Sequence, residues 1–154
     1  GLKEVLYETL GAPDRAASQR LGMASFRLLH HVAERLLEAG AGAVIESNFR
    51  RGISEPDLAR LIAGHRAALV HCEGNPGTIV RRCRERAERG QRHPGHHDLQ
   101  VVSLVRQDLA AGVYALLALD IPLLRVDTTT ATEYVPGFDE IVSFLTRLAQ
   151  PPSA

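Results

Sequence analysis

Apolar residues recur at helical spacing along most of the chain, and three short apolar runs interrupt that pattern. Spacings of three and four residues between apolar positions predict amphipathic helices. We expect helices over 2–10, about 18–39, 55–63, about 76–89, 98–119 (which Gly112 could interrupt) and about 138–149. The short runs predict buried strands over 43–48, 67–72 and 123–127. In the helix over 18–39, one apolar stripe is expected at Leu21, Leu28, Val32 and Leu36.

Cap-forming residues mark where several of these elements begin and end. Gly40 and Gly90 follow the last residues of two predicted helices. Ser54 and Asn75 precede two others, and their side chains are expected to cap them. Pro76, directly after Asn75, suits the first turn of a helix.

Short apolar strands separated by helices of this length predict an α/β fold with a parallel sheet. Three strands make a thin sheet with exposed edges, so at least one further strand is expected upstream of Gly1. With 154 residues the chain fits one domain, for which we expect a core over 1–150 and a tail over 151–154.

Composition narrows the classes of function. Eighteen Lys and Arg residues balance eighteen Asp and Glu residues, which argues against binding to long nucleic acids or anionic membranes. No apolar run reaches the roughly 18 residues of a membrane span. Two cysteines are too few for a disulfide scaffold, so a cytoplasmic location is expected.

Polar residues follow each predicted strand, and ligands of open parallel sheets bind beyond the carboxyl ends of the strands. Glu46 and Asn48 close the first strand, Glu73 follows the second, and Asp127 and Thr128 close the third. Ordinary loop polarity would explain any one of them. Their recurrence at all three ends favours a polar site at one edge of the sheet.

The helix over about 76–89 is rich in arginine. Arg82 and Arg86 are four residues apart and therefore share one helix face. Two guanidinium groups on one face suit phosphate oxygens, since each donates paired hydrogen bonds. The alternative is a solvated face balanced by Glu85 and Glu88.

The segment 90–98 (GQRHPGHHD) is a polar loop with several histidines. A zinc site needs three or four ligands in fixed geometry, and adjacent histidines seldom bind one ion together. A flexible lid that brings Arg92 and His93 near a substrate is the preferred interpretation. Roles for His96 and His97 stay unassigned.

The order of these motifs resembles that of a known family. It runs from Lys3-Glu4 through VIESNF (44–49), VHCE (70–73) and Arg82-x-x-x-Arg86 to RHPGH (92–96). In this it is similar to the P-loop kinases of the AAA-33 or zeta-toxin-like group, relatives of chloramphenicol phosphotransferase, gluconate kinase and polynucleotide kinase. The resemblance implies a three-layer P-loop NTPase-like fold, with a parallel sheet flanked by helices, and a lid over about 76–98.

The sequence departs from that family in one respect. It contains no Gly-x-x-x-x-Gly-Lys-Ser/Thr loop, and Lys3 lies in no glycine loop. The resemblance implies that this loop, and a strand ending in an Asp general base, lie upstream of Gly1. We therefore expect a phosphotransferase when the protein is complete, whereas these residues alone should be inactive and bind ATP weakly or not at all.

The resemblance also implies roles for individual residues. Glu46 would lie near Mg²⁺ or the acceptor. Arg82 and Arg86 would neutralise charge on the transferring phosphoryl group of ATP, and Asp127 and Thr128 would lie near the nucleotide base. The residues expected to face the acceptor are Asn48, Arg50, Arg51, Arg92 and His93.

Three functions stay open at this point. The first is an ATP-dependent kinase that phosphorylates a hydroxyl of a small-molecule or nucleotide-like acceptor. The second is a nucleotide-binding or regulatory module that keeps the fold but transfers nothing. The third is an interaction domain with arginine-rich surface helices.

Overall fold

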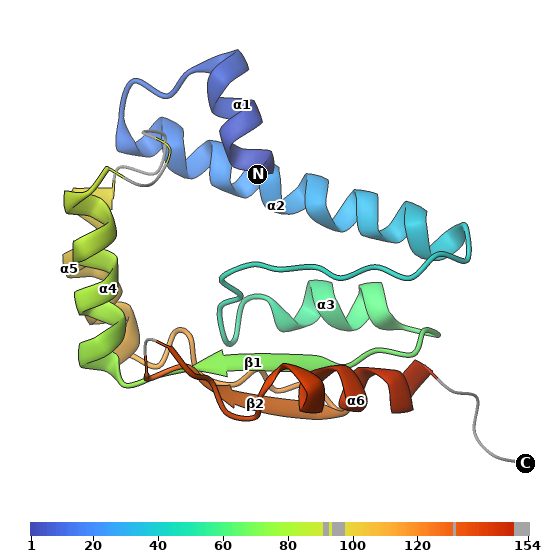
Figure 1. Cartoon of the computed structure of the whole chain (residues 1–154). Coiled ribbons are helices and arrows are strands. Elements are labelled where there is room, and N and C mark those ends of the chain that lie inside the picture. The colour runs from blue at the N-terminus through green and yellow to red at the C-terminus, as the bar shows by residue number, and fades with distance from the viewer. Residues whose placement is uncertain (91–92, 94–97, 131, 150–154) are drawn as a thin grey trace, which may run out of the picture. The chain divides into compact units, whose positions relative to one another are not determined.

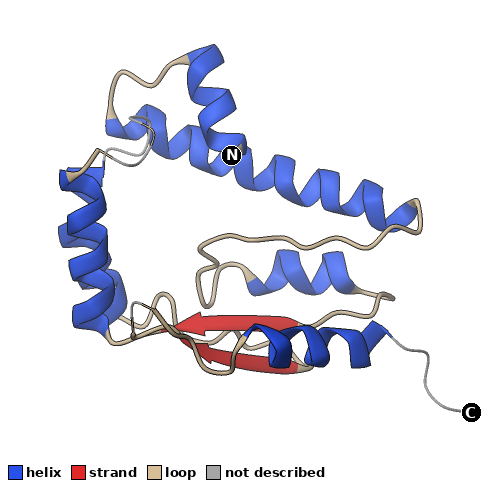
Figure 2. Ribbon diagram, viewed as in Figure 1, coloured by secondary structure: helices blue, strands red, loops and turns tan. Residues whose placement is uncertain are grey.

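The computed structural model describes residues 1–90, 93, 98–130 and 132–149, as six helices and two strands (Figure 1). In chain order they are α1 (Leu2–Leu10), α2 (Arg15–Glu38), α3 (Glu55–Ile62), β1 (Leu69–Glu73), α4 (Pro76–Glu88), α5 (Asp98–Ala110), β2 (Leu123–Asp127) and α6 (Phe138–Ala149). Figure 2 shows the same elements by type. They form two compact units, which are described separately. The first unit comprises Gly1–Asn48 and Val80–Asp108, and the second comprises Phe49–Ile79 and Leu109–Ala154.

The first unit has its core where α1 meets the beginning of α2. Ala12, Ala17 and Leu21 are buried there, with Leu6 and Tyr7 packed against them. The turn between the helices is defined by Gly11, at φ 68°, and by an Asp14 side chain that accepts a hydrogen bond from the Ala17 N–H at 2.7 Å. A left-handed glycine and an Asp cap are common devices for ending one helix and starting the next.

The apolar stripe predicted for α2 is only partly buried. Leu21 is buried, but Leu28, Val32 and Leu36 are exposed. Their spacing gives α2 an amphipathic face, yet burial also requires a neighbouring element, and none in the described residues covers this stretch.

The strand predicted over 43–48 is not present. These residues form a loop without pairing to a strand, and Val44 is 97% exposed. Glu46 and Asn48, expected at the end of a strand, therefore lie in an exposed loop. An apolar run becomes a strand only when a neighbour accepts its backbone hydrogen bonds, and no described strand does so here.

The second unit is built on the two strands that the sequence predicts correctly. β1 and β2 pair in parallel, with a register that runs from Leu69 opposite Leu123 to Glu73 opposite Asp127. In the described part of the chain this sheet has two strands, so the three-stranded sheet expected from these residues is wrong. Among the residues that the structure describes, Val126, which is 2% exposed, is the most deeply buried large side chain.

Helix ends in the second unit follow the predictions with one exception. The Asn75 side chain accepts a hydrogen bond from the Gly77 N–H at 2.9 Å, as a capping residue should. Ser54 precedes α3, but its hydroxyl accepts from the Arg50 N–H at 2.8 Å and makes no cap bond. The predicted side-chain cap at Ser54 is therefore wrong.

Towards the C-terminus, α5 ends at Ala110, two residues before Gly112, which has φ 69°. The helix predicted over 98–119 therefore ends early, and its predicted continuation beyond Gly112 is wrong, because residues 111–119 form turns and loop. α6 covers the predicted span. Among the described helices, none has the length and apolar character needed to cross a membrane. The predicted tail over 151–154 lies outside the described residues.

Candidate functional site

The two parallel strands end beside one another and form a polar rim in the second unit. Figure 1 shows both arrows running in the same direction. Because the register places Glu73 opposite Asp127, the segments Glu73–Asn75 and Asp127–Thr129 leave the sheet together. We call these six residues the strand-end rim. The carboxyl edge of a parallel sheet is the place where α/β proteins most often bind ligands.

Hydrogen bonds hold the two halves of the strand-end rim together. The N–H and the hydroxyl of Thr128 both donate to the Glu73 carbonyl oxygen, each at 2.8 Å. The Asn75 N–H donates to the Thr129 hydroxyl at 3.0 Å. The rim is thus a preorganised polar surface whose geometry does not depend on a ligand.

Gly74 lies between the two halves of the strand-end rim, close to Thr128. A Cβ atom built on Gly74 would lie 3.4 Å from the Thr128 hydroxyl oxygen and 3.6 Å from Cγ1 of Ile79. These are ordinary van der Waals distances, so the backbone here leaves room for a small side chain.

Asp127 is held in its charged form. Hydrogen bonding from Thr129, through its side chain and then its backbone, lowers the pKa of the Asp127 carboxyl from its usual value. The Thr129 N–H donates to Oδ1 of Asp127 at 2.8 Å. The carboxylate therefore has one oxygen committed to the turn, which positions Asp127 at the end of β2.

Glu73, in contrast, is paired along the sheet. Nε and one Nη atom of Arg125 donate to its two carboxylate oxygens at 3.0 Å and 2.7 Å, which is a bidentate pair across neighbouring strands. The hydrogen bonds from Arg125 hold the pKa of Glu73 below its usual value. Its negative charge is balanced locally, so Glu73 contributes its carbonyl oxygen to the rim more than its charge.

This pair gives a testable pH dependence of stability. A carboxyl with a lowered pKa in the folded state stabilises the fold above its unfolded value of 4.5, and this contribution is lost as pH falls through the folded pKa. Urea midpoints measured from pH 7 to about pH 3 should show Glu73→Gln destabilised at neutral pH and converging on the wild type at acid pH. Because the pair is partly exposed, the neutral-pH difference should be less than about 1 kcal/mol. Glu34→Gln, on the exposed face of α2, is the control, and a gap for Glu73→Gln that stays constant with pH would contradict the ion-pair explanation.

The residues predicted to lie near Mg²⁺ or an acceptor are divided between the two units. Glu46 and Asn48 belong to the first unit, and Arg50 and Arg51 to the second. The Arg50 N–H binds the Ser54 hydroxyl, and the Arg51 N–H donates to the Val113 carbonyl oxygen at 2.8 Å. Both arginine side chains are exposed.

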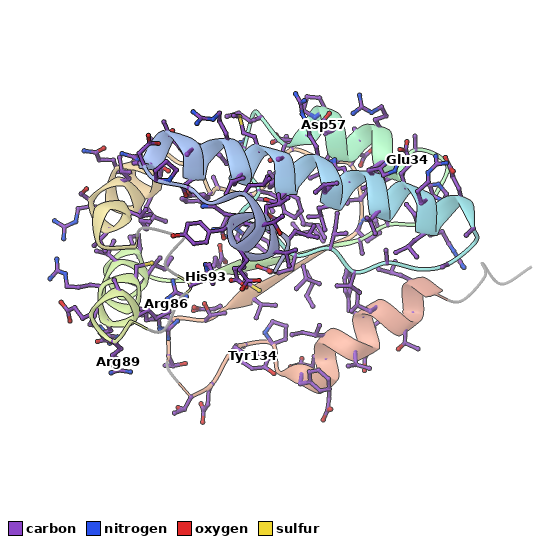
Figure 3. All side chains as sticks on the ribbon, turned by 90° about the horizontal axis from the view of Figure 1, so that it is seen from above. Glu34, Asp57, Arg86, Arg89, His93 and Tyr134 are labelled. Carbon is purple, nitrogen blue, oxygen red and sulfur yellow. The ribbon has the colours of Figure 1, made fainter. Side chains whose placement is uncertain are left out.

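Arg82 and Arg86 lie on α4, as predicted. Arg82 is half-buried, whereas Arg86 is exposed and donates to Sγ of Cys83 at 3.4 Å (Figure 3). Their neighbour Arg81 is paired with Glu85 at 3.1 Å. The helix therefore presents Arg86 to solvent, with no ion pair to a described carboxylate.

His93 lies against α1. Its ring meets Tyr7 edge-on, with centroids 4.9 Å apart, and its Nε2 is 3.6 Å from a carboxylate oxygen of Glu8. Its side chain is only 22% exposed, which is more buried than an open lid residue would be. Arg92, His96 and His97 lie outside the described residues.

Sequence reasoning placed Asp127 and Thr128 at the end of the last predicted strand, and β2 does end at Asp127. It missed Asn75 and Thr129 as rim residues, and Arg125 as the partner of Glu73. The capping role of Asn75 could be predicted from the sequence. The pair between Glu73 and Arg125 could not, because it depends on the register of the two strands. Within the described residues, no group of three or more His, Cys, Asp or Glu side chains could hold a metal ion.

The fold can be compared with known proteins. No protein-family model matches the chain, and a search of curated proteins finds no match. A solved structure from Chloroflexus aurantiacus, described as a putative kinase, matches with a TM-score of 0.81 and 30% sequence identity, covering 97% of this chain and 80% of the other. The chain therefore has an α/β kinase-like fold. It belongs to the same family as that Chloroflexus protein.

Proposed function

We propose that this chain is the core of a P-loop-type kinase that transfers the γ-phosphoryl group of ATP to a hydroxyl of a small-molecule or nucleotide-like acceptor. The observation that carries the proposal is the 30% identity with the putative kinase over 97% of this chain. The strand-end rim supports it, because a polar edge of a parallel sheet is the usual ligand site of such folds.

The arginines of α4 have the chemistry that phosphoryl transfer needs. Catalysis of this reaction is mostly positioning and stabilisation of charge on the phosphoryl oxygens. In our proposal Arg82 and Arg86 supply that positive charge. Arg86 is suited to the task because its guanidinium is exposed and, within the described residues, donates only to the weak acceptor Sγ of Cys83.

The strand-end rim would bind the nucleotide. Asp127 is held by hydrogen bonds from Thr129, and the Thr128 hydroxyl donates to the Glu73 carbonyl oxygen. Their established contacts hold the end of β2 in place, so we assign them to positioning the nucleotide base as well as to contacting it.

Mg²⁺ is the ion we expect with ATP. It is commonly held by one or two carboxylates together with substrate phosphates and water. Glu46 is an exposed carboxylate in a loop, so it fits the ion as a single protein ligand and not as part of a closed cage. When bound, the ion would neutralise charge on the phosphates. Asn48, Arg50, Arg51, Arg92 and His93 are proposed to contact the acceptor.

The test is phosphoryl transfer by the full-length gene product, since these 154 residues contain no Gly-x-x-x-x-Gly-Lys-Ser/Thr loop. Labelled ATP and Mg²⁺ would be incubated with a panel of hydroxylated small molecules and nucleosides. We expect label on an acceptor. ATP binding without transfer to any acceptor would instead indicate a regulatory module, and absence of both would contradict the proposal.

A further inference from the structure

An open groove lies between α4 and α5 in the first unit. Its volume is about 510 Å³, and it is lined by Arg84, Glu88, Val102, Ser103, Arg106 and Gln107. This volume is within the range of roughly 300–1,000 Å³ that is typical of small-molecule sites. Figures 1 and 3 both show the two helices side by side.

The helical spacing of the lining residues shows that the groove is formed by two matching faces. Arg84 and Glu88 are one turn apart on α4, and the four lining residues of α5 fall at 102, 103, 106 and 107. At about 100° per residue, Arg84 is about 200° from Arg82 around α4. The groove therefore uses the face of α4 opposite to the pair proposed for phosphoryl transfer.

The two arginines of the groove have charge available for a ligand. No ion pair joins Arg84 or Arg106 to a carboxylate within the described part of the chain, whereas nearby Arg81 is paired with Glu85. Guanidinium groups from two different helices can approach one oxyanion from two sides, each with a fork of donors. Ser103, Gln107 and Glu88 add groups that hydrogen-bond hydroxyls.

We propose that the α4–α5 groove is a binding site for a small hydroxylated molecule that carries a phosphate group. Arg84 and Arg106 bind the phosphate oxygens, and Glu88 accepts a hydrogen bond from a ligand hydroxyl. A carboxylate presents the same oxyanion chemistry with less charge, so it is the alternative that the experiment distinguishes. This inference goes beyond the proposed kinase function and is independent of it, because it concerns binding in the absence of ATP.

The test is calorimetric titration of the chain with ribose 5-phosphate, with glycerate as the carboxylate arm and ribose as the uncharged control. We expect saturable binding of ribose 5-phosphate, weaker binding of glycerate and none of ribose. Arg84→Ala and Arg106→Ala should each weaken binding by about tenfold or more, as expected for loss of hydrogen bonds to a charged group. Arg84→Lys should lose most of that affinity too, because lysine keeps the charge but not the fork.

Arg81→Ala is the matched control, since it removes an arginine of the same helix that does not line the groove. It should leave the affinity unchanged, and circular dichroism should show all variants folded. Equal binding of glycerate would assign the groove to carboxylates and overturn the phosphate assignment. Absence of saturable binding, or binding that neither Arg84→Ala nor Arg106→Ala weakens, would overturn the site itself.

Discussion

Replacement of Arg86 by alanine in the full-length protein should lower turnover by about 10³-fold while changing nucleotide affinity by only a few-fold. An arginine that meets the transferring phosphoryl group stabilises charge that is spread over its oxygens in the transition state, and such residues contribute 10³-fold or more to turnover. The interaction is weaker in the ground state, so ATP binding should lose little. Arg82→Ala is expected to show the same division between turnover and affinity.

The position of Arg86 makes this experiment interpretable. The side chain is exposed and donates a hydrogen bond to Sγ of Cys83, so its removal should not disturb the packing of α4. Arg81→Ala is the control, because Arg81 is also exposed on α4 but is occupied by Glu85. Steady-state kinetics and ATP titration of the three variants separate the two effects. Similar losses in turnover and ATP affinity would assign Arg86 to ground-state binding, contrary to the proposed role.

The sequence predicted local elements well where their pattern is self-contained. The boundaries of β2 and α6 agree with the apolar runs over 123–127 and 138–149. The run over 43–48 is similarly apolar, but it is not a strand in the described structure. The stripe of α2 shows the same limit, because spacing indicates an apolar face but not the element that covers it. Such errors arise where strand formation or burial depends on a neighbouring element of the fold and not on the local sequence.

The candidate site, too, could be predicted from the sequence only in part. The rule that ligands bind beyond parallel strand ends was enough to select Asp127 and Thr128. It could not show that Thr128 joins both strands through the Glu73 carbonyl oxygen, since that contact spans 55 residues of sequence. It also could not show that Arg125 neutralises Glu73. The net charge of the strand-end rim therefore depends on the register of β1 and β2, which is known only from the folded structure.

The second large effect is expected at Val126, the most buried large side chain of the described structure. Val126→Ala should lower the free energy of unfolding by about 2–3 kcal/mol, from the loss of two methyl groups and from the cavity left behind. Val126 lies on β2 opposite Cys72 and directly before Asp127, so its packing supports the strand end on which the rim is built. Urea unfolding followed by circular dichroism measures the change.

The chain provides a closely matched control in Val44→Ala, which removes the same atoms from a side chain that is 97% exposed. Its effect should be within about 0.5 kcal/mol, as for most surface substitutions. A comparable loss for the two variants would mean that Val44 is covered in solution or that Val126 is not part of a packed core. A large loss at Val126 alone would show that the two-stranded sheet of the second unit is a cooperative part of the fold, so that the arrangement of Asp127, Thr128 and their partners is maintained by apolar packing directly beneath them.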